Sequence, residues 1–200
     1  MKTIFKIIVL LAVSIGYAQD NNVTIEEKYL HDPFEQPKVY YKDVNGVLNK
    51  FIGTWKWQNT STTPTKIFEI TFYKVENRDR GGSSTTDELK SSFTYSVNGA
   101  TVYDTSIDGI ESWVSGSWIV PNSSFTASNG LIINNTKMEL SYSEPIIDGR
   151  PLRKNPNGTL QLEYQNVNGE ERLVWNVECF LDQNGNIPFR IPITMTLIKQ

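Results

Sequence analysis

The stretch Phe51-Ile52-Gly53-Thr54-Trp55-Lys56-Trp57 decides the fold of this chain. It contains a Gly-x-Trp pattern, and it opens a series of short β-like runs that continues to residue 200. A glycine followed by a large aromatic at this position is typical of the first strand of an all-β domain. We therefore take Gly53 and Trp55 as the signature residues of the fold.

Turn signals divide the rest of the chain at short intervals. Eight of the thirteen glycines follow Asn or Asp, as in Asn98-Gly99 and Asn168-Gly169. Such pairs supply the positive φ angles of tight turns and are the strongest local signal for a hairpin. Between the turns, apolar and polar residues alternate, which indicates antiparallel strands with one buried and one solvated face.

The alternation predicts an all-β fold with sequential strands. The expected ranges are 53–58, 66–76, 90–98, 101–107, 112–120, 124–133, 137–143, 159–166, 171–181 and 190–199. A sheet of hairpin-linked strands must hide its two edges, and closure into a barrel does so completely. We predict an antiparallel up-and-down β-barrel of 8–10 strands with a short N-terminal capping helix. A β-sandwich is the alternative.

The first 18 residues have the features of a cleaved secretory signal peptide. Lys2 and Lys6 give a positive start, and residues 7–13 form an apolar run that is too short to span a bilayer. Ala18 offers a small residue at the cleavage point. The expected location is secreted or periplasmic, in a Gram-negative bacterium, with no membrane insertion after cleavage.

Two further segments follow the signal peptide. Residues 19–44 are polar, contain Pro33 and Pro37 and show no sustained periodicity, so they predict an N-terminal arm or linker. Residues 45–200 show no break in composition and predict one lipocalin-like β-barrel domain.

The opening strand carries a resemblance to known families. Phe51-Ile52-Gly53-Thr54-Trp55-Lys56 resembles the first strand of the fatty-acid-binding proteins and, more loosely, the Gly-x-Trp block of the lipocalins; both are calycin β-barrels. With its export signal and Tyr40-Tyr41-Lys42-Asp43, the chain resembles an uncharacterised family of exported bacterial lipocalin-like proteins. The resemblance implies that Gly53 lets the chain bend past the capping helix and that Trp55 plugs the closed end of the barrel.

The resemblance also concerns the last strands. In those families a basic residue often packs across the tryptophan, and Arg190 and Lys199 are the candidates here. The fatty-acid-binding proteins end in an Arg-x-Tyr pair that holds the carboxylate of the ligand. The run 190–197 contains no such pair, so capture of a carboxylate by that route is not expected.

Charge and cysteine content restrict the partners. The chain has a formal net charge of −3, and loss of Lys2 and Lys6 with the signal peptide makes it more acidic. Nucleic acids and anionic membranes are held by clustered Lys and Arg, so neither is an expected partner. Cys179 is the only cysteine and cannot form a disulfide within the chain; its phase in the run 173–179 predicts a buried, inert thiol. A monomer is the default expectation.

The residues needed for catalysis are sparse. His31 is the only histidine and lies in the arm, which argues against histidine-dependent catalysis and a histidine-rich metal site. No catalytic residue, metal ligand or cofactor is therefore predicted. A barrel enzyme that pairs an interior tyrosine with a glutamate is the less favoured alternative; its candidates are Tyr73, Tyr95 and Tyr164 with Glu69, Glu163 and Glu178.

Aromatic residues give the remaining lead to function. They fall mostly in the inward phase of the strands, where they serve packing and also suit a cavity for a small, largely apolar ligand. The predicted ligand-binding residues inside the barrel are Phe93, Tyr95, Trp118, Tyr164 and Trp175. We expect a non-catalytic binding barrel on this basis.

Two other interpretations stay open. In the first, the barrel is filled by its own side chains and acts as a structural or interaction module through the loops 77–89 and 144–158. In the second, the domain is a carbohydrate-binding sandwich, which would present Trp113 or Trp118 as a flat, exposed platform.

Overall fold

The computed structural model describes residues 22–30, 39–59, 63–79, 84–106, 113–121, 133–145, 156–182 and 184–200. The predicted signal peptide and His31 lie outside these residues, as do most of the predicted loop 144–158 and most of the predicted strand 124–133. None of the helices in the described ranges is long and apolar enough to cross a membrane.

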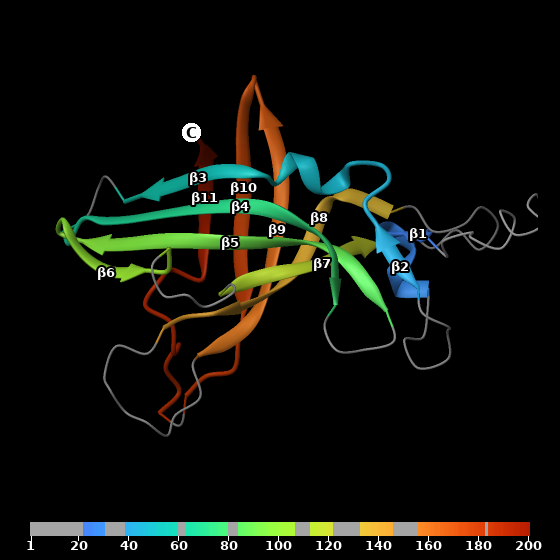
Figure 1. The fold of residues 1–200 in the computed structure, drawn as a ribbon. Coiled ribbons are helices and arrows are strands. Elements are labelled where there is room, and N and C mark those ends of the chain that lie inside the picture. Colours follow the sequence, from blue (N-terminus) through green and yellow to red (C-terminus); the bar gives the residue numbers. More distant parts are fainter. Residues whose placement is uncertain are drawn as a thin grey trace, which may run out of the picture.

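The described chain is almost entirely β-structure (Figure 1). The strands are β1 (Asn22–Thr24), β2 (Tyr40–Lys42), β3 (Gly53–Gln58), β4 (Lys66–Asp79), β5 (Thr85–Val97), β6 (Ala100–Asp104), β7 (Val114–Pro121), β8 (Ile133–Ser143), β9 (Asn157–Val167), β10 (Glu170–Glu178) and β11 (Thr194–Lys199). Two short 3-10 helices, η1 (Ile25–Leu30) and η2 (Val47–Lys50), complete the set.

Eight antiparallel strands close into a barrel, in the order β5-β4-β3-β11-β10-β9-β8-β7 and back to β5. Strand β6 pairs with β5 outside this ring. The predicted all-β fold and up-and-down barrel are thus confirmed. The capping helix is minor, since the only helical turn before the first barrel strand is η2.

The barrel consists of two sheets that cross each other, as β3–β5 and β9–β11 do in Figure 1. Within the sheets the pairing is long: β4 and β5 pair from Lys66 to Asp79. The two seams between the sheets are short. Strands β5 and β7 share only two residue pairs, and so do β11 and β3. The sheets are therefore held together more by side chains between them than by ladder hydrogen bonds.

One difference between the predicted and the observed strands concerns a loop to which a function was assigned. The predicted recognition loop 77–89 is mostly strand, because β4 continues to Asp79 and β5 begins at Thr85. Only residues 80–84 connect them. A register shift between Val75 and Arg78 accompanies the extension, and a bulge of this kind bends and twists a long hairpin.

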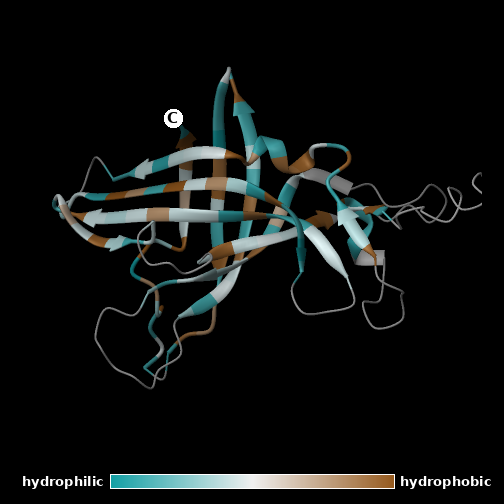
Figure 2. Cartoon of the chain, viewed as in Figure 1, coloured by the Kyte–Doolittle hydropathy of each residue, from teal (hydrophilic) through white to brown (hydrophobic). Residues whose placement is uncertain are grey.

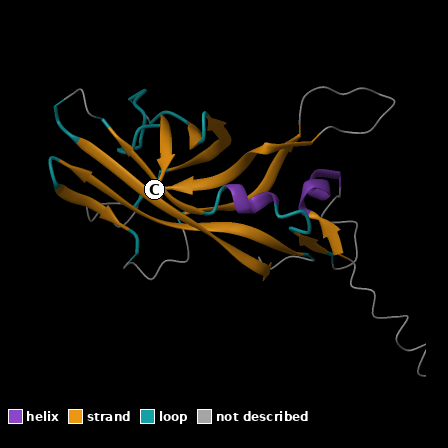
Figure 3. Cartoon of the chain, turned by 90° about the horizontal axis from the view of Figure 1, so that it is seen from above, coloured by secondary structure: helices purple, strands orange, loops and turns teal. Residues whose placement is uncertain are grey.

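The segment expected to be an arm contributes to the sheet. Strand β2 pairs in parallel with β5, and β1 pairs in parallel with β2. Ile25 and Tyr41 are buried in the core, and Figure 3 shows both short helices at the same end of the molecule. Strands of three residues are too short to show a period in the sequence, which explains the difference from a free linker.

Asp87 fixes this N-terminal segment to the barrel. Its carboxylate is buried and accepts hydrogen bonds from the Tyr40 hydroxyl (2.5 Å), the Asp43 backbone N–H (2.9 Å) and the Asn77 backbone N–H (3.0 Å). Asp43 in turn accepts from the Val47 N–H at the start of η2 (2.6 Å). Asp87 thus joins β2 to the hairpin β4–β5, and Asp43 connects this contact to η2.

Apolar and polar bands alternate along the barrel strands (Figure 2). On β4 the buried residues are Phe68, Ile70 and Phe72, and on β8 they are Met138, Leu140 and Tyr142. A period of two places one set of side chains inside the barrel and leaves the other set outside. The inner set forms one continuous core.

We predict that Asp87→Ala lowers the free energy of unfolding by about 2–4 kcal/mol, because one buried donor, the Asp43 N–H, and two partly buried donors lose their acceptor. Asp87→Asn, which keeps one carbonyl oxygen, should lose less. Urea unfolding followed by circular dichroism measures both. Glu76→Ala removes an exposed carboxylate that pairs with Lys74 and should change stability by less than about 0.5 kcal/mol. Equal stability of Asp87→Ala and wild type would refute the role of Asp87.

Candidate functional site

Aromatic rings pack against one another inside the barrel. The Trp175 ring lies between Phe68 (5.3 Å between ring centroids) and Tyr142 (5.2 Å), and Phe68 also contacts Phe93 (5.6 Å). All four side chains are buried. Because they come from β4, β5, β8 and β10, their rings meet across the interior of the barrel.

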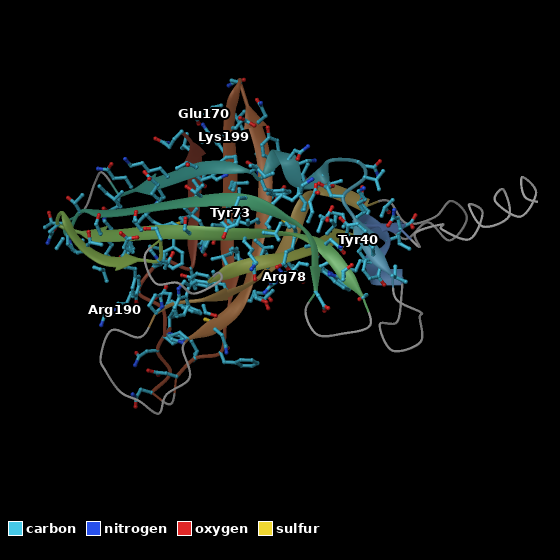
Figure 4. All side chains as sticks on the ribbon, in the orientation of Figure 1. Tyr40, Tyr73, Arg78, Glu170, Arg190 and Lys199 are labelled. Carbon is cyan, nitrogen blue, oxygen red and sulfur yellow. The ribbon has the colours of Figure 1, made fainter. Side chains whose placement is uncertain are left out.

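One end of the barrel is closed by Trp55. Its indole N–H donates to the Phe51 carbonyl (2.8 Å), and its ring is fully buried. The Lys199 ammonium lies 5.3 Å from the ring centroid, so Lys199 is the basic residue across the tryptophan and Arg190 is not. Figure 4 shows Lys199 at this end of the barrel and Arg190 at the other. Gly53 has a φ of 123°, which only glycine adopts readily.

The opposite end is closed by a buried glutamate. The two oxygens of Glu144 accept four hydrogen bonds: Oε1 from the Tyr142 hydroxyl (2.6 Å) and the Ile191 N–H (3.0 Å), and Oε2 from the Tyr103 hydroxyl (3.1 Å) and the Arg190 N–H (2.9 Å). Glu144 is fully buried. The bonds hold the chain before β11 across the mouth of the barrel.

This cluster contains the Glu–Tyr pair that a barrel enzyme would need, but the carboxylate oxygens are already used in hydrogen bonds within the fold. A carboxylate offers about four acceptor positions, and all of those of Glu144 are occupied. Burial raises the pKa of Glu144 above its usual value, while the hydrogen bonds from Tyr142 and the backbone act in the opposite direction. Burial and the nearby Glu144 charge raise the pKa of Tyr142 and Tyr103, which keeps both phenols neutral.

The sequence did not single out Glu144, although a signal was present. Met138, Leu140 and Tyr142 set the inward phase of β8, and Glu144 is the next residue in that phase. A charged residue in the inward phase at the end of a strand indicates that its side chain is buried and hydrogen-bonded there.

The structure separates the predicted interior residues into three groups. Phe93, Tyr95 and Trp175 lie inside the barrel and are buried. Tyr164 is half-buried beside Phe51 at the Trp55 end, where its hydroxyl donates to Glu171 (2.8 Å). Of the other tyrosines considered for catalysis, Tyr95 donates to the Arg190 carbonyl (3.2 Å) and Tyr73 is exposed.

The prediction that Trp118 lines the interior is wrong. Its side chain is 41% exposed, while Ser117 and Ile119 are buried. The pairing of β7 with β8 shifts register between Ser115 and Trp118. One extra residue in a strand moves every later side chain to the other face, so Trp118 points outward.

Trp118 begins a row of polar residues on the outer surface. In the strand registers Trp118 pairs with Glu139, Glu139 with Gln161, and Gln161 with Asn176. Directly paired residues project from the same face of a sheet. The Gln161 amide donates to Glu139 (3.4 Å) and to Glu178 (3.2 Å). The row therefore crosses β7–β10 as a connected set of amide and carboxylate groups beside an indole.

Two hollows flank this row. The larger, of about 610 Å³, is lined by Ser141, Tyr142, Ser143, Asn157, Gly158, Thr159, Glu178, Cys179 and Phe180. The smaller, of about 360 Å³, is lined by Val120, Lys137, Met138, Gln161, Leu162, Glu163, Val174 and Asn176. Both lie over the outer faces of β8–β10; the larger presents mainly polar groups, and the smaller presents polar and apolar groups together.

Cys179 is half-buried in the wall of the larger hollow and unbridged, whereas a buried thiol was expected. Gly158 lies close against the backbone of Glu178 in the same wall. A larger residue would not fit, because a Cβ at position 158 would lie 2.5 Å from the Glu178 carbonyl oxygen. In the described part of the chain no three or more His, Cys, Asp or Glu side chains are placed to hold a metal ion.

Apolar side chains are exposed next to the larger hollow. Phe180 is 91% exposed, and Leu181 and Ile187 are also exposed. The intervening turn is ordered by Asp182, whose carboxylate accepts from the Asn184 and Asn186 N–H groups (both 2.8 Å). Phe180 thus precedes an ordered turn and lies at the edge of the hollow, outside the core.

The chain belongs to a family of unknown function, DUF6705, whose model matches residues 1–200. Searches of curated proteins and of solved structures found no match.

The raised tyrosine pKa values predict instability at alkaline pH. In the unfolded chain tyrosines ionise near pH 10, whereas Tyr142, Tyr103 and Tyr95 stay neutral in the fold. The free energy of unfolding should therefore fall above pH 10, by about 1.4 kcal/mol per pH unit for each such tyrosine.

Tyr142→Phe should make this decline less steep, because one of the tyrosines with a raised pKa is removed. Urea unfolding at a series of pH values measures the slope. Tyr73→Phe, on the exposed face of β4, is the matched control and should keep the wild-type slope. A slope of Tyr142→Phe equal to that of the wild type would contradict the assignment.

Proposed function

We propose that this protein is an exported, non-catalytic binding module that recognises its ligand with the outer surface of a filled barrel. The observation that carries the proposal is the packing of Trp175 between Phe68 and Tyr142. Rings packed across the barrel leave the interior to its own side chains. Binding on this account takes place outside.

The closure of both ends supports the same conclusion. Trp55 is fully buried at one end, and Glu144 holds Arg190 and Ile191 at the other. A ligand on its way to the interior would have to break a set of buried hydrogen bonds, which are costly to leave unmade. The hollows on β8–β10, in contrast, are accessible without rearrangement.

The chemistry of Glu144 supports a non-catalytic role. A general acid or base must reach the proton that it transfers. Glu144 has no exposed atom and no free acceptor position, and its tyrosine partners remain neutral because their pKa values are raised. The cluster is suited to holding the barrel mouth closed.

One observation favours a second candidate, a small, largely apolar ligand inside the barrel. The indole N–H of Trp175 is buried and has no hydrogen-bond partner among the described residues. A buried donor without an acceptor is uncommon in proteins. A guest with one acceptor oxygen would satisfy it, as would a single water molecule.

Native mass spectrometry separates the two candidates. We predict that residues 19–200, purified without detergent, show the bare mass of the polypeptide, and that Trp fluorescence does not respond to fatty acids. The same spectra report the oligomeric state, which we expect to be a monomer.

Trp175→Phe provides the control, because it keeps a ring and removes the unpaired N–H. A retained apolar molecule in the wild type, lost in Trp175→Phe, would overturn the proposal in favour of the interior site.

A further inference from the structure

We infer that the outer face of β7–β10 is a binding site for a neutral carbohydrate chain. This inference rests on the proposed function, since it assigns a ligand class to the external surface. The site consists of Trp118, Glu139, Gln161, Asn176 and Glu178, which are brought together by strand register and the Gln161 hydrogen bonds.

The first argument is the exposed indole. Trp118 is 41% exposed on a strand whose neighbouring residues, Ser117 and Ile119, are buried. The ring is thus displayed on a rigid, paired strand and not on a loop. A pyranose ring has a face of C–H groups, and a flat aromatic offers it a large contact area with little loss of conformational freedom.

The second argument is the chemistry of the groups beside the indole. Sugar hydroxyls both donate and accept, and amide and carboxylate side chains complement them. Gln161 donates to Glu139 and Glu178, while its amide oxygen accepts no hydrogen bond from any described residue. Asn176 accepts from the Thr194 hydroxyl (3.3 Å), which fixes its orientation. The row is therefore held in place before a ligand arrives.

The third argument is shape. Gln161 and Asn176 line the smaller hollow, and Glu178 lines the larger one. Phe180 also lines the larger hollow, with 91% of its surface exposed. A chain of sugars lying across the strands would contact the Trp118 ring and the polar groups of the row, and the two hollows extend this surface along the strands.

Charge selects among carbohydrates. Glu139 and Glu178 belong to the site itself, and Lys137, which lines the smaller hollow, is paired with Glu163 (3.1 Å). Uronic acids and sulfated sugars would meet like charges there. Neutral chains meet acceptors for their hydroxyls instead, so the face fits neutral glycans.

An array of neutral oligosaccharides with gluco-, xylo-, manno- and chito- backbones tests the inference, with calorimetry on the best binder. We expect Trp118→Ala to weaken binding at least about tenfold, because the stacking surface is lost. Gln161→Ala should weaken it about fivefold through loss of hydrogen bonds.

The matched control is Tyr73→Ala. Tyr73 is 42% exposed, nearly the same as Trp118, but it lies on β4 in the other sheet, where Figure 4 labels it. It should leave binding unchanged. Each variant must keep the wild-type unfolding midpoint, and Gln161→Ala gives a second test that does not alter an aromatic.

Binding that is lost in Trp118→Ala and kept in Tyr73→Ala supports the site. No binding to any neutral glycan, or equal loss in the two aromatic variants, overturns it. Either result leaves the proposed function standing, because that proposal fails only if an apolar ligand is found inside the barrel.

Discussion

The contact of Phe68 on β4 with Trp175 on β10 is the interaction on which the rest of the structure depends. It joins two sheets that share only two residue pairs at each of their seams. With so few ladder hydrogen bonds between them, the sheets are held face to face by apolar packing, at about 25 cal/mol per Å² of buried surface. Tyr142 extends the same contact to β8.

This packing has consequences for function. Because rings occupy the interior, polar groups lie at the ends of the barrel and on its outer face. At the mouth, Glu144 gathers two phenols and two backbone N–H groups into a closed set. On the outer face, Gln161 connects two glutamates while remaining accessible. The first arrangement stabilises the fold, and the second is available to a ligand.

The sequence predicted the barrel because its signals were local. Gly53 and Trp55 opened the first strand as expected, and the alternation around Phe93 and Tyr95 placed those rings inside. Trp118 was misplaced because a bulge shifts the phase of β7, and no pattern within one strand reveals a change in its pairing.

The candidate site was less predictable than the fold. Glu139, Gln161 and Asn176 are polar residues in the outward phase of three strands. The sequence of each strand alone does not show that they are neighbours. Only the register of the sheet aligns them with Trp118. The alternative of a carbohydrate-binding sandwich required Trp113 or Trp118 to be exposed; Trp118 is exposed and Trp113 is buried, but the fold is a barrel.

The central claim is that the barrel is filled by its own side chains. An electron-density map of the protein crystallised directly after purification, without added lipid or detergent, tests it most directly. The account predicts continuous side-chain density across the interior, with at most one water at the Trp175 indole N–H. Elongated density of a bound molecule between Trp175 and Tyr142, with the rings displaced, would contradict it.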